Sequence, residues 1–204
     1  MIHLHEFIDK YVTKRPESMF RADLHAHQSA LAKAIEGKSV LVIGGAGSIG
    51  SSFIKALLPF RPKSLVVVDI NENALTELTR ELRSTSAFTV PTDYVTYPMS
   101  YADEVFVKMF KARAGFDIVA NFSAHKHVRS EKDKYSVEAL LKNNVVNAKK
   151  LLDLLCDYPP QHFFCVSTDK AANPVNIMGG SKKIMEDMIM AYAKHFPVTT
   201  ARFA

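Results

Sequence analysis

A glycine-rich turn between an apolar run and a helix-like stretch is the feature that most restricts how this chain can fold. Ser39–Ile43 reads S-V-L-V-I, Gly44–Gly50 reads G-G-A-G-S-I-G, and the helix-like Ser51–Leu58 follows at once. A strand, a glycine turn and a helix in that order are the context of a dinucleotide-binding fingerprint. Without side chains the turn can be tight, a pyrophosphate can approach the backbone, and the helix can pack closely on the strand.

The glycines of this turn have G-x-x-G-x-x-G spacing, through Gly44, Gly47 and Gly50. The free N–H groups at the helix start, where Ser48 and Ile49 lie, are expected to face phosphate oxygens. The turn is therefore predicted to hold the pyrophosphate of a dinucleotide cofactor.

A second apolar run, Leu65–Val68, ends in Asp69, nineteen residues after Gly50. An acidic residue at this distance accepts hydrogen bonds from the adenosine ribose. Its charge would repel a 2′-phosphate, so NAD is predicted rather than NADP. The alternative is that Asp69 only caps the helix that starts near Asn71.

Beyond residue 37, apolar strand-like runs alternate with helix-like stretches. The expected strands lie near 39–43, 64–68, 92–97, 117–122, 162–166 and 197–202, and the expected helices near 48–58, 71–83, 102–114, 134–156 and 176–195. This alternation predicts an α/β fold, a Rossmann-type doubly wound parallel sheet with helices on both faces. In a chain of 204 residues, 48% of them hydrophobic, residues 38–204 are expected to form one domain.

Residues 1–37 are expected to form a helical extension. Apolar residues recur at helical spacing from Leu4 to Val12, and Pro16 is expected to end that helix. A second helix is predicted from Ala22 to Glu36, with its apolar face packed on the sheet domain or on a partner chain.

Composition excludes several classes of function. No segment approaches a membrane span, and the N-terminus carries Glu6 and Asp9 where a signal peptide would be apolar. Two cysteines, Cys156 and Cys165, give no disulfide framework, so a reducing cytoplasm is expected. The net charge of +5 is mild and lacks an aromatic-interleaved basic motif, so no nucleic-acid partner is expected. No metal site is expected either, because further ligands at recognisable spacing are missing around the three H-x-H pairs, His3/His5, His25/His27 and His125/His127.

The most informative segment, Ser167–Lys182, reads S-T-D-K-A-A-N-P-V-N-I-M-G-G-S-K and follows an apolar run. Open α/β sheets bind ligands at the carboxyl ends of their strands. A hydroxyl, a carboxylate and an amine at adjacent positions there, Thr168, Asp169 and Lys170, predict an active site. The alternative is a polar loop that caps a helix. Asn173-Pro174 is expected to fix the turn into that helix.

The chain resembles the extended short-chain dehydrogenase/reductases, specifically the CapD-like polysaccharide-biosynthesis branch that contains UDP-N-acetylglucosamine 4,6-dehydratases. The resemblance covers residues 38–204 and rests on five motifs in order: G-G-A-G-S-I-G, V-D-I-N-E-N-A-L at 68–75, N-F-S-A-H-K-H-V-R-S-E-K-D at 121–133, Asn144-Val145, and the segment 167–182. In relatives, roughly a hundred further residues build a lobe that grips the nucleotide diphosphate. This chain is therefore expected to be a fragment of a longer protein, or a trimmed cofactor domain without the substrate lobe.

The resemblance implies roles for individual residues. Those implied to contact the cofactor or order its site are Asn121, Ser123, Ala124, Asn144 and Lys182. Those implied to border the sugar are His125, Lys126, His127 and Asn173. Adenine contact is expected from Ser100 or from backbone groups, because the aspartate that relatives often carry near the adenine is absent. Ser181 is expected either beside the cofactor or on the helix surface.

The catalytic residues implied are Thr168, Asp169, Lys170, Met178 and Lys182. Most relatives have a tyrosine base at Met178, but a thioether cannot exchange a proton, and this chain resembles the dehydratase subgroup that carries methionine there. In the implied reaction, hydride leaves sugar C4 for bound NAD while Asp169, Lys170 or a water held by Thr168 takes the 4-hydroxyl proton. A neutral Lys170 then removes the C5 proton, a protonated Asp169 donates to the departing 6-hydroxyl, and the stored hydride returns to C6. The alternative for these two residues is a simple ion pair.

The function implied is a 4,6-dehydratase acting on a UDP-N-acetylhexosamine in surface-polysaccharide synthesis. Two alternatives stay open: a nucleotide-sugar 4-epimerase, which needs no acid–base pair for elimination, and a non-catalytic NAD-binding module. The resemblance also implies a homo-oligomer that associates through the helices near 102–114 and 134–156.

Overall fold

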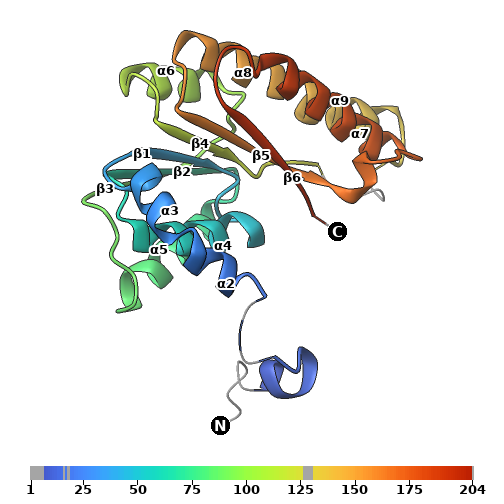
Figure 1. Ribbon diagram of the computed structural model, residues 1–204. Coiled ribbons are helices and arrows are strands. Elements are labelled where there is room, and N and C mark those ends of the chain that lie inside the picture. The colour runs from blue at the N-terminus through green and yellow to red at the C-terminus, as the bar shows by residue number, and fades with distance from the viewer. Residues whose placement is uncertain (1–6, 16, 18, 126–130, 204) are drawn as a thin grey trace.

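The computed structural model describes residues 7–15, 17, 19–125 and 131–203. These residues form one parallel sheet of six strands in the order β3-β2-β1-β4-β5-β6 (Figure 1). The strands are β1 (Ser39–Ile43), β2 (Ser64–Asp69), β3 (Asp93–Pro98), β4 (Ile118–Asn121), β5 (His162–Thr168) and β6 (Val198–Phe203). The predicted doubly wound α/β fold is confirmed. The strand order reverses between β1 and β4, where sheets of this kind bind their ligands.

Helices cover both faces of the sheet (Figure 1). On one face lie α2 (Arg21–Ala26), α3 (Gln28–Ile35), α4 (Ser48–Leu57) and α5 (Glu72–Ser84), and on the other α6 (Glu104–Ala112), α7 (Lys134–Leu141), α8 (Ala148–Asp157) and α9 (Ile177–Tyr192). Two short 3₁₀ turns, η2 (Leu58–Phe60) and η5 (Asp169–Ala171), follow α4 and β5.

The core consists of two layers because successive strand residues point to opposite faces. In β1, Val40 and Val42 pack with the layer of α4 and α5, whereas Leu41 and Ile43 pack with the layer of α6, α8 and α9. All four are at most 1% exposed. Burial on both faces explains why the central strands read as continuous apolar runs rather than as alternating patterns.

The helix predicted over 134–156 contains a break in its regular winding. A π-helical segment, η4 (Lys142–Asn147), lies between α7 and α8. Its wider turn changes which residues face the sheet, and Asn144 and Asn147 are both buried within it. Such single wide turns inside α-helices are frequent at functional sites.

The N-terminal helices differ from their predicted course. The helix expected from Ala22 to Glu36 is wrong as one piece, because His27 leaves helical geometry (φ −103°, ψ 6°) and separates α2 from α3. Ile35 packs on the core, whereas Leu24 is 49% exposed. The first predicted helix is described as a π-helical segment, η1 (Ile8–Val12), which stands apart from the sheet in Figure 1. Pro16, its expected end, lies outside the described residues.

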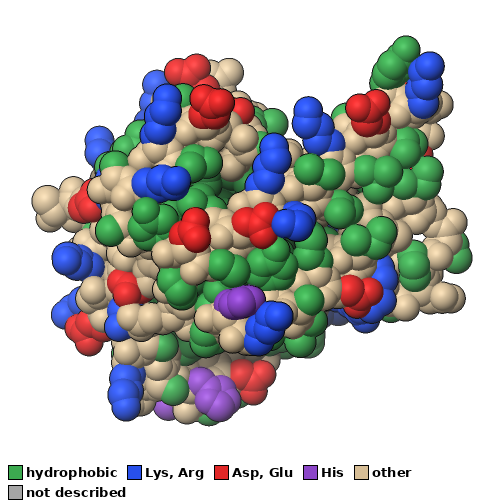
Figure 2. Space-filling view, turned by 90° about the horizontal axis from the view of Figure 1, so that it is seen from above, with side chains coloured by type: hydrophobic (Ala, Val, Ile, Leu, Met, Phe, Trp, Pro, Cys, Tyr) green, Lys and Arg blue, Asp and Glu red, His purple; other side chains and the backbone are tan. Residues whose placement is uncertain are grey.

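Figure 2 shows the layer of α6–α9 from above, where hydrophobic side chains lie among charged ones of both signs. The exposed large apolar residues of this layer are Val105, Tyr135, Val146, Ile177, Ile184 and Met190. Apolar side chains on an outer helix layer can pack against a partner chain. The homo-oligomer stays a prediction, and these residues mark the surface that it would use.

Candidate functional site

Two adjoining hollows lie at the carboxyl end of the sheet, where the strand order reverses. The first, of about 210 Å³, is lined by Asp69, Ser100, Tyr101 and Ser123 among others. The second, of about 200 Å³, is lined by residues that include Ser48, Ile49, Gly50, Thr168, Met178, Lys182 and Phe203. Both are lined by Gly44, Gly47, Phe122 and Ala124. The structure therefore brings most of the predicted cofactor residues together around one groove.

The glycine turn is shaped so that no side chain fits at two of its positions. Gly44 has φ +72°, and a Cβ there would lie 2.7 Å from the backbone nitrogen of Ser123. A Cβ on Gly50 would lie 2.4 Å from the carbonyl oxygen of Gly44. Gly47 is the N-cap of α4, and no described side chain accepts a hydrogen bond from the first turn of this helix. A bare helix start beside an open groove can hold a phosphate group, as the fingerprint predicts.

Asp69 fixes the turn against the end of β2. Its Oδ2 accepts a hydrogen bond from the N–H of Ala46 and its Oδ1 from the N–H of Asn71, both at 3.0 Å. The N-cap of α5 is Asn71, whose side chain accepts from the N–H of Ala74 at 3.0 Å. The alternative that Asp69 itself caps this helix is therefore wrong. The carboxylate lines the first hollow, where it can accept hydrogen bonds from a ribose diol.

The floor of the first hollow contains a residue that the sequence reasoning missed. The Tyr101 hydroxyl donates to the carbonyl oxygen of Asn143 at 2.9 Å, and the residue is only 7% exposed. Burial raises the pKa of this hydroxyl, so it stays protonated and acts as a donor. Tyr101 directly follows Ser100, and an aromatic residue just beyond a strand end was the available signal.

Polar groups after β4 hold the wall that the two hollows share. The buried Asn121 accepts at its Oδ1 from the backbone N–H of Ser123 at 2.9 Å and from the Ser123 hydroxyl at 2.6 Å. The Asn144 side chain binds the next stretch of chain, because it donates to the carbonyl of His125 and accepts from the N–H of His125, both at 2.9 Å. It also donates to the Ser181 hydroxyl at 3.0 Å.

Ser181 is 1% exposed, so the alternative that placed it on the helix surface is wrong. His125 itself is exposed at the rim of the first hollow. Lys126 and His127, the other predicted rim residues, lie outside the described part of the chain.

The hydroxyl, carboxylate and amine at the end of β5 lie side by side. The Thr168 hydroxyl donates to Asp169 Oδ1 at 2.8 Å, and Lys170 Nζ lies 3.1 Å from the same oxygen. The hydrogen bonds from Thr168 and Lys170 lower the pKa of Asp169, so its charged form is favoured. About half of each side chain of the acid–amine pair is exposed. A protonated Asp169 therefore requires desolvation that the described residues do not supply, and in this structure the two side chains form the simple ion pair.

Met178 and Lys182 lie deep in the second hollow. Met178 is 1% and Lys182 is 3% exposed. Burial lowers the pKa of Lys182, whose ammonium donates to the carbonyl oxygen of Val166 at 2.7 Å. The lysine therefore fastens α9 to β5 at the point where both line the groove. Phe203, which also lines this hollow, was not predicted as a site residue.

The start of α9 lies within a residue of its predicted position near 176. The N-cap is Asn176, whose Oδ1 accepts from the N–H of Gly179 at 2.7 Å. Asn173-Pro174 lies in the turn between η5 and α9, and the first-turn N–H is satisfied by the Asn176 side chain. Asn173 is exposed and lines neither hollow.

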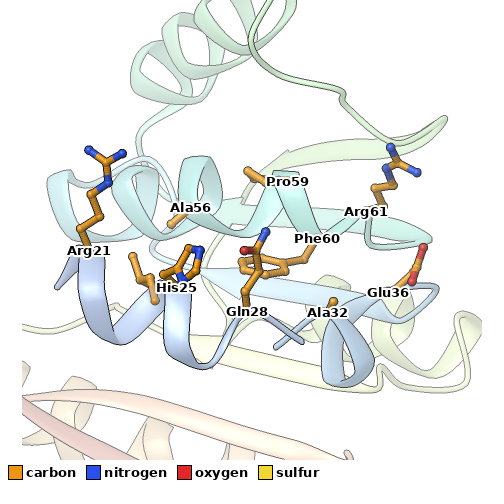
Figure 3. Close-up of a pocket in the computed structure, with 10 residues that line it drawn as sticks. Arg21, His25, Gln28, Ala32, Glu36, Ala56, Pro59, Phe60 and Arg61 are labelled. Carbon is orange, nitrogen blue, oxygen red and sulfur yellow. The ribbon is translucent and has the colours of Figure 1, made fainter. Parts of the chain in front are cut away.

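A separate cavity of about 590 Å³ lies between α2–α3 and α4–η2. Figure 3 shows Arg21 and Arg61 at its opposite ends, with His25, Gln28 and Phe60 between them. It shares no lining residue with the two hollows. Within the described ranges, no three His, Cys, Asp or Glu side chains come together as metal ligands, and no helix has the length and apolar character that crossing a membrane requires.

Comparisons with known proteins agree with this geometry. Residues 40–204 match the family model described as polysaccharide biosynthesis protein. A Methanocaldococcus jannaschii protein named uncharacterized membrane protein MJ1061 is 37% identical over 154 residues, which cover 76% of this chain and 43% of that protein. The probable polysaccharide biosynthesis protein EpsC of Bacillus subtilis is 29% identical over 89% of this chain and 30% of its own length. UDP-N-acetylglucosamine 4,6-dehydratase (inverting) of Campylobacter jejuni is 26% identical over 76% of this chain and 43% of its own.

Solved structures share the fold. The UDP-Glc/GlcNAc 4-epimerase of Campylobacter jejuni superposes with a TM-score of 0.69 at 22% identity over 81% of this chain and 53% of its own. UDP-glucuronic acid 4-epimerase of Bacillus cereus, solved with UDP-glucuronic acid and NAD, gives a TM-score of 0.65 at 21% identity over 80% of this chain and 55% of its own. This chain spans less than half the length of each of the three sequence relatives. It belongs to the polysaccharide biosynthesis protein family, in the CapD-like branch of the extended short-chain dehydrogenase/reductases.

Proposed function

We propose that this chain supplies the cofactor-binding and catalytic part of an NAD-dependent nucleotide-sugar 4,6-dehydratase of surface-polysaccharide synthesis. The observation that carries the proposal is the position of Thr168, Asp169 and Lys170 at the end of β5, beside a groove with a glycine cradle. The Campylobacter jejuni relative is named as a dehydratase of UDP-N-acetylglucosamine, which supports a UDP-N-acetylhexosamine as substrate.

The residues present fit a dinucleotide. The glycine turn leaves no room for a side chain at Gly44 or Gly50, which suits a pyrophosphate. The Asp69 carboxylate suits the adenosine ribose, and its negative charge favours NAD over a phosphorylated dinucleotide. When bound, NAD supplies a reversible hydride acceptor, so the sugar can be oxidised and reduced within one cycle.

The polar groups at the end of β5 then divide the proton transfers. Thr168 is suited to hydrogen-bond the sugar 4-oxygen and to hold a water that takes the 4-hydroxyl proton, Lys170 to remove the C5 proton, and Asp169 to donate a proton to the departing 6-hydroxyl. The last two roles require a neutral amine and a protonated acid. A bound sugar nucleotide and the lobe that relatives place over it would exclude water from this half-exposed pair, and desolvation favours uncharged side chains.

Met178 supports elimination over simple epimerisation. A thioether has no exchangeable proton, so the methionine cannot serve as the base that a tyrosine provides in most relatives. A second candidate is nonetheless a nucleotide-sugar 4-epimerase, because the solved neighbours include enzymes of that name. An epimerase needs no acid–base pair at C5 and C6. Variants of Asp169 and Lys170 therefore distinguish the two reactions.

The test is mass spectrometry of UDP-N-acetylglucosamine after incubation with NAD and the protein at its native length. Loss of one water from the sugar nucleotide is the expected result. K170A and D169N are each expected to lower the rate of water loss by about 100-fold or more, in line with general acid–base contributions. An unchanged mass despite measurable NAD binding would refute the dehydratase for this substrate, and retained conversion in both variants would favour the epimerase. The wider predictions of a cytoplasmic, homo-oligomeric enzyme belong to the same proposal.

A further inference from the structure

The chain on either side of residues 126–130 is fastened to a single residue of α9. On one side, the side chain of Asn144 holds both backbone groups of His125 and donates to the Ser181 hydroxyl. That hydroxyl donates to the carbonyl oxygen of Met178 at 2.7 Å. On the other side, the N–H of Met178 donates to Glu131 Oε1 at 2.6 Å. Both connections therefore end on the main chain of Met178.

The Glu131 bond is not needed to cap the helix. The cap of α9 is Asn176, which accepts from the N–H of Gly179, one residue further on. Glu131 takes a different first-turn N–H, and its negative charge at a helix N-terminus strengthens that hydrogen bond. Its position after β4 and before α7 means that the bond joins two segments 47 residues apart in the sequence.

The same helical turn also contacts the proposed catalytic residues. A Cβ on Gly179 would lie 2.5 Å from the carbonyl oxygen of Lys170, so η5 rests directly on the first turn of α9. The side chain of Met178 is buried in the wall of the second hollow. The first turn of α9 therefore holds the chain at His125 in place and also supports the Thr168–Lys170 turn.

We propose that Glu131 is a positioning residue for the dehydration: it holds the chain just before α7 against the start of α9 and so fixes the spacing between the rim at His125 and the acid–base pair. The proposal rests on the proposed function. The Glu131 carboxylate accepts from the main chain of Met178, and its role is assigned through that residue. Its loss should therefore reduce turnover and leave the cofactor cradle intact.

The experiment uses the native-length protein with three variants: E131A, E131Q and the control E138A, which removes an exposed glutamate from α7. E131A is expected to lower kcat about 10- to 100-fold, the scale of a small misplacement of reacting groups. The Kd for NAD should stay within about twofold, since misplacement beyond the cradle leaves ground-state binding unchanged. E131Q keeps an oxygen acceptor and should recover most of kcat, and E138A should match the wild type.

A second readout does not depend on the reaction. With ¹³C-methyl methionine labelling, the Met178 methyl resonance, assigned through M178L, should shift in E131A and hold its position in E131Q and E138A. An unchanged Met178 resonance or an unchanged kcat in E131A would overturn the proposal, as would parallel losses of NAD affinity and thermal stability. A wild type that binds NAD and does not dehydrate the sugar would overturn the proposed function and the catalytic part of this one. In that case the Met178 methyl resonance would still test whether Glu131 holds the start of α9 in place.

Discussion

Two neighbouring glycines at the start of α9 should respond in opposite ways to the same substitution. A Cβ on Gly179 would lie 2.5 Å from the carbonyl oxygen and 3.2 Å from the carbonyl carbon of Lys170. A Cβ on Gly180 would meet no heavy atom within 4 Å. Both residues lie inside the same helix, so alanine improves the intrinsic helical preference equally at each, by roughly 1 kcal/mol.

For Gly180→Ala that gain is unopposed, and the free energy of unfolding should rise by about 0.5–1 kcal/mol. For Gly179→Ala the helix and the η5 turn must move apart, and overpacking of this kind costs about 1–3 kcal/mol. The net result should be a loss of up to about 2 kcal/mol. In a domain of this size, 1 kcal/mol corresponds to roughly 2–4 °C in Tm.

The assay is thermal unfolding of the two single variants and the wild type, followed by circular dichroism without cofactor. The expected order of Tm is Gly180→Ala, wild type, Gly179→Ala. An equal rise in both variants would refute the argument, because it would show that the η5 turn does not rest on Gly179.

Two further predictions concern the cofactor cradle and an ion pair whose acidic member is nearly buried. Gly50→Ala places a Cβ 2.4 Å from the Gly44 oxygen, so the turn must open. NAD affinity, measured by calorimetric titration, should therefore fall at least about 10-fold, or roughly 1.4 kcal/mol. An unchanged Kd would show that the turn does not hold the cofactor. Hydrogen bonds from Arg202 hold the pKa of Glu186 below its ordinary value, although burial opposes them, and the Glu186 side chain is only 7% exposed. Because the folded-state pKa is the lower one, the stabilisation is complete above the ordinary pKa of about 4.3 and is lost as pH falls through the folded value. Urea unfolding should show Glu186→Gln less stable than wild type at pH 7 with a gap that closes in acid, and a constant gap would refute the assignment.

The sheet and the cradle were predictable because their signals are local. An apolar run has to be a strand when a glycine turn and a helix follow it, and the six strands lie within a residue or two of their expected positions. Gly44 and Gly50 were identifiable for the same reason, since only the absence of a Cβ allows their close approaches.

The features that escaped prediction depend on contacts between distant segments. The wide turn at Lys142–Asn147 exists where Asn144 reaches His125 and Ser181, and neither partner is a neighbour of Asn144 in the sequence. The hydrogen bond between Glu131 and Met178 is of the same kind. In the sequence alone, Glu131 is one charge within a basic, polar stretch.

The backbone amide of Met178 donates to Glu131, and its carbonyl accepts from Ser181 within α9; the Met178 side chain takes no part in either bond. These main-chain hydrogen bonds can therefore form with any amino acid at position 178 whose side chain fits the available volume. A single substitution at this position can therefore change the chemistry of the site without moving the elements that line it. A family could thus exchange a proton-transferring side chain for an inert one, or regain it, while every neighbouring element stays in place. Met178→Tyr is the natural starting point for redirecting this site toward a different reaction.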